Sequence, residues 1–165
     1  MTSKSSIKKT NAARLLDRAG IAYELIPYQV DEEDLSARHV AEQLSEPIEC
    51  VFKTLVLRGD KTGLFVCVLP GDHGLDLKAA ARVSGNRKAE MIPMKDLLQS
   101  TGYIRGGCSP VGMKKALPTF FHSSVNDHPF IYVSAGQRGL QFKIAPQDLL
   151  NYVHATVADL VIQSE

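Results

Sequence analysis

Two apolar runs separated by a short polar turn constrain this chain most. Residues 51–57 and 64–69 are almost entirely apolar, and the intervening residues 58–63 are polar and include two glycines. Apolar runs of this length, without strict alternation, are typical of strands that are covered on both faces. We therefore predict a β-hairpin whose two strands lie in the middle of a sheet.

Lys53 interrupts the first of these runs. An unpaired ammonium is costly to bury, so this side chain must reach solvent, a counter-ion or a ligand. One interpretation is a lysine on a solvated sheet face. The other is a cation that points into a cleft, where it holds a phosphate or a carbonyl oxygen.

Helical and strand patterns alternate irregularly along the rest of the chain. Several predicted strands follow one another within hairpin reach, which favours an α+β fold with a mixed sheet over a doubly wound parallel sheet. No linker divides the chain, so we predict a tail at 1–10 and one domain at 11–165. The patterns predict helices at 11–19, 36–44, 76–83, 93–99 and 146–153, and strands at 21–28, 103–105, 119–122, 130–134, 140–144 and 156–162.

The composition is that of an ordinary globular protein, with 44% hydrophobic residues and a net charge of +1. No apolar run approaches the roughly 18 residues of a membrane span, and the polar N-terminus lacks a signal-peptide core, so we expect a cytoplasmic protein. The charge neither demands nor excludes nucleic acid. Local basic patches could come from Lys4, Lys8, Lys9, Arg14 and Arg18, or from Arg105, Lys114, Lys115 and Arg138.

Metal and nucleotide cofactors are not indicated. The three cysteines form no Cys-x-x-Cys pair, and the five histidines are not at metal-ligand spacing. The chain has neither a Walker loop nor a Gly-x-Gly-x-x-Gly motif. We therefore expect no cofactor and no metal.

Two glycine-containing segments could carry chemistry. In residues 100–110, Gly106 and Gly107 could aim backbone N–H groups at an oxyanion, although a plain turn also explains paired glycines. In residues 132–140, Ser134 and Arg138 lie at a turn between two predicted strands. No Gly-x-Ser-x-Gly motif surrounds Ser134 and no histidine is identified as its base, so a Ser-His-Asp hydrolase is not indicated.

Seven segments along the chain form one combined pattern. They are Phe52-Lys53-Thr54-Leu55, Leu75-Asp76-Leu77-Lys78-Ala79-Ala80, Lys88-Ala89-Glu90-Met91, Ser100-Thr101-Gly102-Tyr103, Gly106-Gly107-Cys108-Ser109-Pro110, Ile131-Tyr132-Val133-Ser134 and Arg138-Gly139-Leu140. Taken together, these segments resemble the YbaK/EbsC family of small free-standing deacylases, which includes Cys-tRNA(Pro)/Cys-tRNA(Cys) deacylases. The likeness extends from about residue 12 to 161. Cys108 stands where close relatives usually carry an aliphatic residue, so it could be a reactive thiol or a buried structural cysteine.

The resemblance implies a compact domain with a mixed, partly barrel-like sheet surrounded by helices, related to the editing domain of prolyl-tRNA synthetase. It also implies hydrolysis of the ester between an amino acid and the tRNA 3′ end. In the cysteinyl enzymes the substrate's own thiol attacks this ester, so no protein nucleophile is needed. The resemblance thus also implies lyase-like chemistry through a thiolactone. The implied partners are the 3′ end of tRNA(Pro) carrying cysteine and prolyl-tRNA synthetase.

The residue roles that we expect follow from the same resemblance. Lys53 would hold the terminal phosphate or ribose, and the amides of Gly106 and Gly107 would meet the carbonyl oxygen. Ser134 and Tyr28 would orient the adenosine or the aminoacyl group. The remaining substrate-binding candidates are Thr54, Tyr103 and Arg138.

Two other functions remain open at this point. The chain could clear another small aminoacyl-tRNA, such as Ala-tRNA(Pro), in which case activity would not need a substrate thiol. It could also be a non-catalytic module that binds the tRNA end or the synthetase without turnover.

Overall fold

The computed structural model describes residues 7–162. Residues 1–6 of the predicted tail therefore lie outside the described residues, as do residues 163–165 of the predicted domain. Residues 7–10 belong to no helix or strand, and the first helix starts directly after them. Both Thr10 and Asn11 are residue types that cap helices, and the structure has Thr10 as the N-cap, whose hydroxyl oxygen accepts a hydrogen bond from the Ala13 amide.

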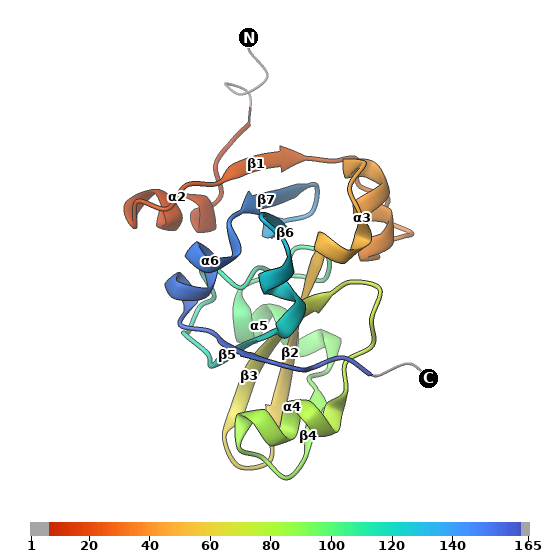
Figure 1. Ribbon diagram of the computed structural model, residues 1–165, viewed down its shortest axis with the longest axis vertical. Coiled ribbons are helices and arrows are strands. Elements are labelled where there is room, and N and C mark those ends of the chain that lie inside the picture. Colours follow the sequence, from red (N-terminus) through yellow and green to blue (C-terminus); the bar gives the residue numbers. More distant parts are fainter. Residues whose placement is uncertain (1–6, 163–165) are drawn as a thin grey trace.

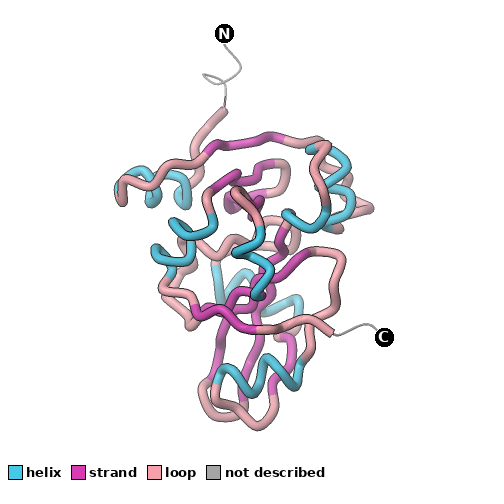
Figure 2. The backbone as a smooth tube through the Cα atoms, in the orientation of Figure 1, coloured by secondary structure: helices cyan, strands magenta, loops and turns pink. Residues whose placement is uncertain are grey.

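The strands of the described part form two open sheets (Figures 1 and 2). The α+β class and the mixed sheet are confirmed, but neither sheet closes into a barrel. The smaller sheet has the order β1-β7-β6, with β1 (Glu24–Pro27), β7 (Leu140–Ile144) and β6 (Ile131–Gln137). The larger has the order β4-β2-β3-β5-β8, with β4 (Ala89–Met91), β2 (Phe52–Gly59), β3 (Gly63–Pro70), β5 (Thr119–His122) and β8 (Thr156–Ala158).

The predicted central hairpin is β2–β3. Its strands pair antiparallel, with Lys53 opposite Leu69 and Thr54 opposite Val68, and each has a further strand on its outer side. Side chains alternate between the faces of a strand, so Val68 packs into one apolar cluster and Leu69 into another. Burial on both faces explains why these runs do not alternate in polarity.

The helices begin where the sequence offers caps. Ser36 and Asp76 accept hydrogen bonds from amides in the first turns of their helices, and Gly85 ends the second of these in a left-handed conformation. The helices are α2 (Asn11–Arg18), α3 (Ala37–Leu44), α4 (Leu77–Ser84), α5 (Leu97–Thr101) and α6 (Pro146–Val153), with short 3₁₀ turns η1 (Ile48–Cys50), η2 (Met94–Asp96) and η3 (Ser123–Asp127).

The structure corrects the reading of residues 89–105. The predicted strand at 103–105 is absent, because the Tyr103 amide donates to the Thr101 hydroxyl oxygen and the Tyr103 hydroxyl donates to the Val111 carbonyl oxygen, which holds this segment as a loop. The predicted helix at 93–99 divides into η2 and α5, and the sequence analysis missed the three-residue strand β4. Short elements such as β4 carry too few residues for a period to be visible.

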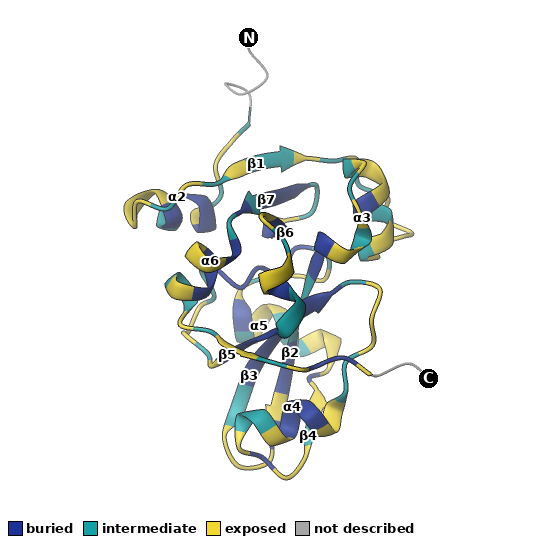
Figure 3. Cartoon of the chain, in the orientation of Figure 1, coloured by how far each residue is buried: buried dark blue, intermediate teal, exposed yellow. Residues whose placement is uncertain are grey.

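The two sheets meet at the start of β2. An isolated parallel bridge joins Val51 to Tyr132 of β6, and the Gly71 amide donates to the Val51 carbonyl oxygen at 2.9 Å. A Cβ at Gly71 would lie 1.9 Å from the Cβ of Ala37, so only glycine lets α3 pack against this junction. Figure 3 shows buried residues in the strands of both sheets.

None of the described helices is long and apolar enough to cross a membrane.

Candidate functional site

A small pocket of about 90 Å³ lies where α3, the start of β2, the loop of residues 102–110 and the β6–β7 pair come together. We call this loop, which carries Gly106 and Gly107, the glycine loop. This arrangement unites segments from four parts of the sequence. Its lining residues are Leu35, Ala37, Val40, Val51, Phe52, Lys53, Thr54, Gly106, Cys108, Ser134 and Gln141. Four residues that the sequence singles out, Lys53, Thr54, Gly106 and Ser134, are therefore brought to one place.

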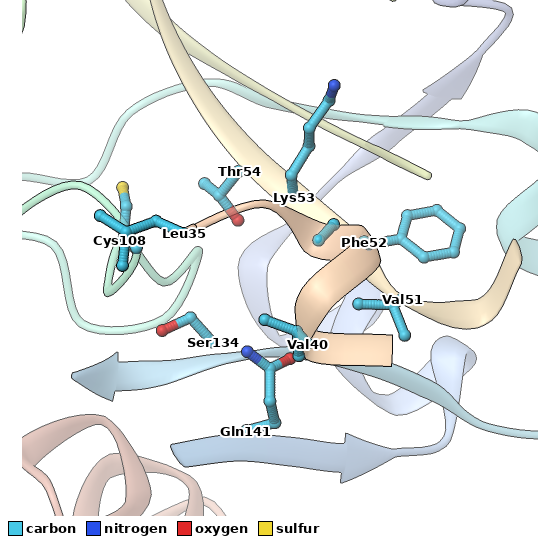
Figure 4. A pocket seen from close by; sticks show the side chains of 11 residues that line it. Leu35, Val40, Val51, Phe52, Lys53, Thr54, Cys108, Ser134 and Gln141 are labelled. Atoms are coloured by element: carbon cyan, nitrogen blue, oxygen red, sulfur yellow. The ribbon is translucent and has the colours of Figure 1, made fainter. Parts of the chain in front are cut away.

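Lys53 and Thr54 leave opposite faces of β2. Figure 4 shows the Lys53 side chain extending away from Ser134 and Gln141, whereas the Thr54 hydroxyl is on their side. Burial lowers the pKa of Lys53, and the negative charge of Asp72 partly opposes this effect. Lys53 thus places a half-buried cation at the edge of the pocket, not at its bottom.

Two buried oxygen atoms in the pocket have no hydrogen-bond partner among the described residues: Thr54 Oγ1 and Gln141 Oε1. Gln141 is only 5% exposed and lies opposite Ser134 in the register of β6 and β7. Buried polar atoms are nearly always paired with protein or ordered water in folded proteins, so these two oxygens are acceptors that a water molecule or a ligand can use. The sequence analysis missed Gln141, although a polar residue inside the apolar strand 140–144 is the same signal that identified Lys53.

The two glycines of the loop differ in their surroundings. Gly106 lines the pocket with a positive φ of 84°, and the described hydrogen bonds include none from its amide. The Gly107 amide already donates to the Ile104 carbonyl oxygen at 2.9 Å. A Cβ at Gly107 would lie 3.1–3.2 Å from the backbone of Gln137 and Arg138, so close packing explains this glycine.

The hydroxyl of Ser134 and the thiol of Cys108 are both beside the pocket, but neither is an activated nucleophile. Ser134 Oγ accepts a hydrogen bond from the Gly136 amide at 3.1 Å. Burial raises the pKa of Cys108 to about 12, which keeps the thiol protonated at neutral pH. Of the two interpretations of Cys108, the structure supports the buried structural one.

Three predicted binding residues lie outside the lining. Tyr28 packs against the cluster around α3, and its amide donates to the Gly139 carbonyl oxygen. Tyr103 is tied to the Val111 carbonyl oxygen by its hydroxyl. Arg138 donates to the Arg105 carbonyl oxygen and pairs with Glu32 at 3.0 Å, so it fixes the glycine loop next to Gly106.

The chemistry of the lining is limited. Its described residues include no carboxylate and no histidine. The one lining group whose pKa is lowered towards that of a general base is Lys53, and its ammonium extends away from Ser134 and Gln141. The described part of the chain also holds no group of three or more His, Cys, Asp or Glu side chains that could bind a metal ion. What the pocket offers is shape, two free acceptors, a free amide and a nearby cation.

The chain is similar in sequence to a family of known proteins. Residues 31–152 match the family model described as the aminoacyl-tRNA editing domain. The protein of Enterococcus faecalis that is named as the Cys-tRNA(Pro)/Cys-tRNA(Cys) deacylase EbsC is 44% identical over 160 residues, which cover 97% of this chain and 98% of that protein.

More distant likenesses are partial or structural. A proline–tRNA ligase of Thermosipho africanus is 30% identical over 80 residues, or 48% of this chain and 14% of the ligase. A crystal structure named as a trans-editing enzyme for prolyl tRNA synthetase superimposes with a TM-score of 0.83 at 24% identity, covering 94% of this chain and all of that one. This last likeness shows a shared fold.

Proposed function

Since the chain belongs to the aminoacyl-tRNA editing domain family, we propose that it is a trans-editing deacylase that hydrolyses mischarged aminoacyl-tRNA, with Cys-tRNA(Pro) as its main substrate. The resemblance to the YbaK/EbsC family is confirmed by this domain match together with the identity to EbsC. The observation that carries the proposal is the 44% identity, over nearly both full lengths, to a protein named as a Cys-tRNA(Pro)/Cys-tRNA(Cys) deacylase.

The size of the pocket agrees with a small aminoacyl group. An engineered protein cavity of about 150 Å³ admits benzene, so a volume of about 90 Å³ suits a side chain as small as that of cysteine. The acceptors Thr54 Oγ1 and Gln141 Oε1 would take hydrogen bonds from donors on the substrate, of which the α-ammonium is the strongest. The amide of Gly106 would donate to the ester carbonyl oxygen.

The described lining has no carboxylate, no histidine and no activated nucleophile, and the Lys53 ammonium extends away from Ser134 and Gln141, which agrees with substrate-assisted cleavage. The cysteinyl sulfur attacks the ester carbonyl carbon, the new C–S bond forms, and the C–O bond to the ribose breaks. The thiol proton ends on the released ribose oxygen, and the resulting thiolactone is opened by water to cysteine. The protein contributes positioning and oxyanion stabilisation, which together can supply much of the barrier reduction.

Lys53 fits a role outside the aminoacyl pocket. Its ammonium extends away from Ser134 and Gln141, so it would hold the terminal phosphate or ribose while the amino acid occupies the pocket. Ser134 would orient the aminoacyl group from β6. For Tyr28, Tyr103 and Arg138 we propose support of the pocket walls, and for Gly107 close packing of the glycine loop, in place of direct substrate contact.

A deacylation assay of the purified protein tests this function, with Cys-, Ala- and Ser-tRNA(Pro) as parallel substrates. We expect fast loss of cysteine alone. Loss of alanine would favour the alternative substrate, Ala-tRNA(Pro), and would exclude the thiol-assisted step. If none of the three esters is cleaved but tRNA(Pro) or prolyl-tRNA synthetase binds, the non-catalytic binding module replaces the enzyme.

A further inference from the structure

The end of the β2–β3 hairpin farthest from the pocket is built from two segments that are distant in sequence. The side-chain oxygen Asn86 Oδ1 accepts hydrogen bonds from the amides of Lys61 and Thr62, at 2.8 and 2.9 Å. In return, Asp60 Oδ1 accepts from the amides of Arg87 and Lys88, at 2.9 and 3.1 Å. These reciprocal bonds hold the cationic residues 61, 87 and 88 side by side at one tip.

The cationic side chains of this tip are free to bind a partner. Lys61, Arg87 and Lys88 are all exposed, and none of them belongs to an ion pair among the described residues. We call these three residues the hairpin tip. The bottom of Figure 3 shows that the turns between the elements are exposed here.

Two carboxylates, Asp60 and Glu90, lie in the same segments. The amide hydrogen bonds to Asp60 lower its pKa, so its negative charge persists near Lys61. Glu90 lies directly opposite Arg58 in the β2–β4 register. A local excess of two positive charges remains, although the net charge of the whole chain is only +1, when the formal charges of these residues are combined: Arg58, Asp60, Lys61, Arg87, Lys88 and Glu90.

The other side of the pocket carries negative charge, so the two sides of the pocket differ in the sign of their charge. Residues 31–34, before α3, are all acidic and exposed, and of these Glu32 is paired with Arg138. A polyanion that enters the pocket would be repelled by this side and attracted towards the hairpin. The length of β2 from Lys53, which lines the pocket, to Gly59, at the far end of the strand, is about 20 Å, since a strand rises about 3.4 Å per residue.

From this geometry we propose that the hairpin tip binds the phosphate backbone of the substrate tRNA beyond its 3′-terminal nucleotide. The inference rests on the proposed function, because it assumes that the 3′ end occupies the pocket beside Lys53. Three exposed cations, with no ion pair among the described residues and with their backbone held by hydrogen bonds, suit the phosphates of a polyanion. The tip thus adds affinity for the tRNA body and takes no part in the chemistry.

The test compares a tip variant with a matched control. The tip variant carries Lys61→Gln, Arg87→Gln and Lys88→Gln, and the control carries Lys8→Gln, Arg14→Gln and Arg18→Gln. Both sets are exposed and both remove three positive charges, so a difference between them reports on location and not on net charge. The control residues come from the other basic patch that the sequence offers near the N-terminus, so the comparison also decides between the two patches. Substrates are full-length Cys-tRNA(Pro) and the 3′-cysteinyl ester of adenosine, and binding of uncharged tRNA(Pro) is followed by fluorescence anisotropy against salt concentration.

We expect the tip variant to raise KM for Cys-tRNA(Pro) roughly tenfold with kcat unchanged. It should leave cleavage of the adenosine ester as in the wild type, and it should lower the slope of log affinity against log salt by about 2 to 3. A set of conservative changes, Lys61→Arg, Arg87→Lys and Lys88→Arg, should restore the wild-type KM. The control should behave like the wild type.

Three results would overturn the inference. Equal effects of the tip variant and the control would mean that only total charge matters, and an equal loss on the adenosine ester would mean that the tip acts through the fold. Normal tRNA binding with lost binding to prolyl-tRNA synthetase would make the tip a protein interface. Failure of the proposed function looks different, because tip-dependent tRNA binding would then be measured without turnover of any ester.

Discussion

Gln141 lies opposite Ser134 in neighbouring strands, and both residues line one pocket, in which Gln141 Oε1 has no hydrogen-bond partner among residues 7–162. A buried acceptor without a partner destabilises the free protein and is satisfied when a ligand brings a donor. The same atom is therefore expected to have opposite effects on stability and on activity. This pairing gives the first prediction.

Replacing Gln141 by Met keeps the size of the side chain and removes the orphan acceptor. We expect kcat/KM for Cys-tRNA(Pro) to fall about ten- to a hundredfold, the loss of one hydrogen bond to a charged donor. The free energy of unfolding should stay level or rise by about 1 kcal/mol. Thermal unfolding and deacylation kinetics measure both.

Ser124→Ala is the matched control for Gln141→Met. Ser124 Oγ is also buried and unpaired among the described residues, but it does not line the pocket. This variant should keep full activity. Equal losses of activity in the two variants, or none in either, would contradict the assignment of Gln141 to the substrate.

Replacing Lys53 by Ala should abolish deacylation and leave the fold intact, because the side chain reaches the edge of the pocket and is only half buried. Circular dichroism and thermal unfolding check the fold, and the tRNA assay checks the activity. Lys53→Arg, which preserves the charge, should retain part of the activity. Wild-type deacylation rates in Lys53→Ala would show that this cation is not needed to hold the substrate.

The lowered pKa of Lys53 also predicts a pH dependence of stability. Between the folded-state pKa and the unfolded value near 10.5, the unfolded chain binds the lysine proton more strongly than the folded chain does. The free energy of unfolding of the wild type should therefore rise with pH across that window, relative to Lys53→Met. Urea unfolding of both proteins at several alkaline pH values measures the difference, and parallel curves would argue against the shift.

Cys108→Ala should keep the activity, because a thiol with a pKa of about 12 is not a nucleophile at neutral pH. The variant should lose about 1 kcal/mol of stability, since it removes a buried sulfur from the core. Iodoacetamide at pH 8 should leave Cys108 of the folded protein unmodified. Rapid alkylation of Cys108, together with loss of activity in the alanine variant, would restore it as a reactive thiol.

Gly71→Ala should displace α3 from the junction of the two sheets. Its Cβ would lie 1.9 Å from the Ala37 Cβ, and such overpacking costs about 1–3 kcal/mol. Because Ala37 lines the pocket, deacylation should fall as well. Adding Ala37→Gly removes the clash and should recover activity, so a double-mutant cycle without coupling between the two sites would refute this account.

The local elements were predictable because their signals are local. Thr10, Ser36 and Asp76 are caps whose hydroxyl or carboxylate lies within reach of the following amides, and these helices begin where predicted. The hairpin β2–β3 was also predictable from its continuous apolar runs. The predicted strand at 103–105 failed because the contact that decides its conformation, from Tyr103 to Val111, is made by a side chain.

The candidate site was predictable only in part. A polar residue inside an apolar run identified Lys53, and the family resemblance identified Gly106 and Ser134. Neither the residue pattern nor the resemblance could tell that the Gly107 amide donates to the Ile104 carbonyl oxygen, because this hydrogen bond depends on the path of the loop. Gln141 was missed, because its significance lies in an oxygen that finds no partner in three dimensions.

The sequence by itself determined the fold class, the central hairpin, most helix starts and the family, since all of these depend on residues that are close together or on a pattern spread over the chain. Only the tertiary structure decided which groups share the pocket, which faces of β2 carry Lys53 and Thr54, and that residues 61, 87 and 88 form one cationic tip. These relationships join segments far apart in sequence, and packing and long-range hydrogen bonds select them, not local propensity.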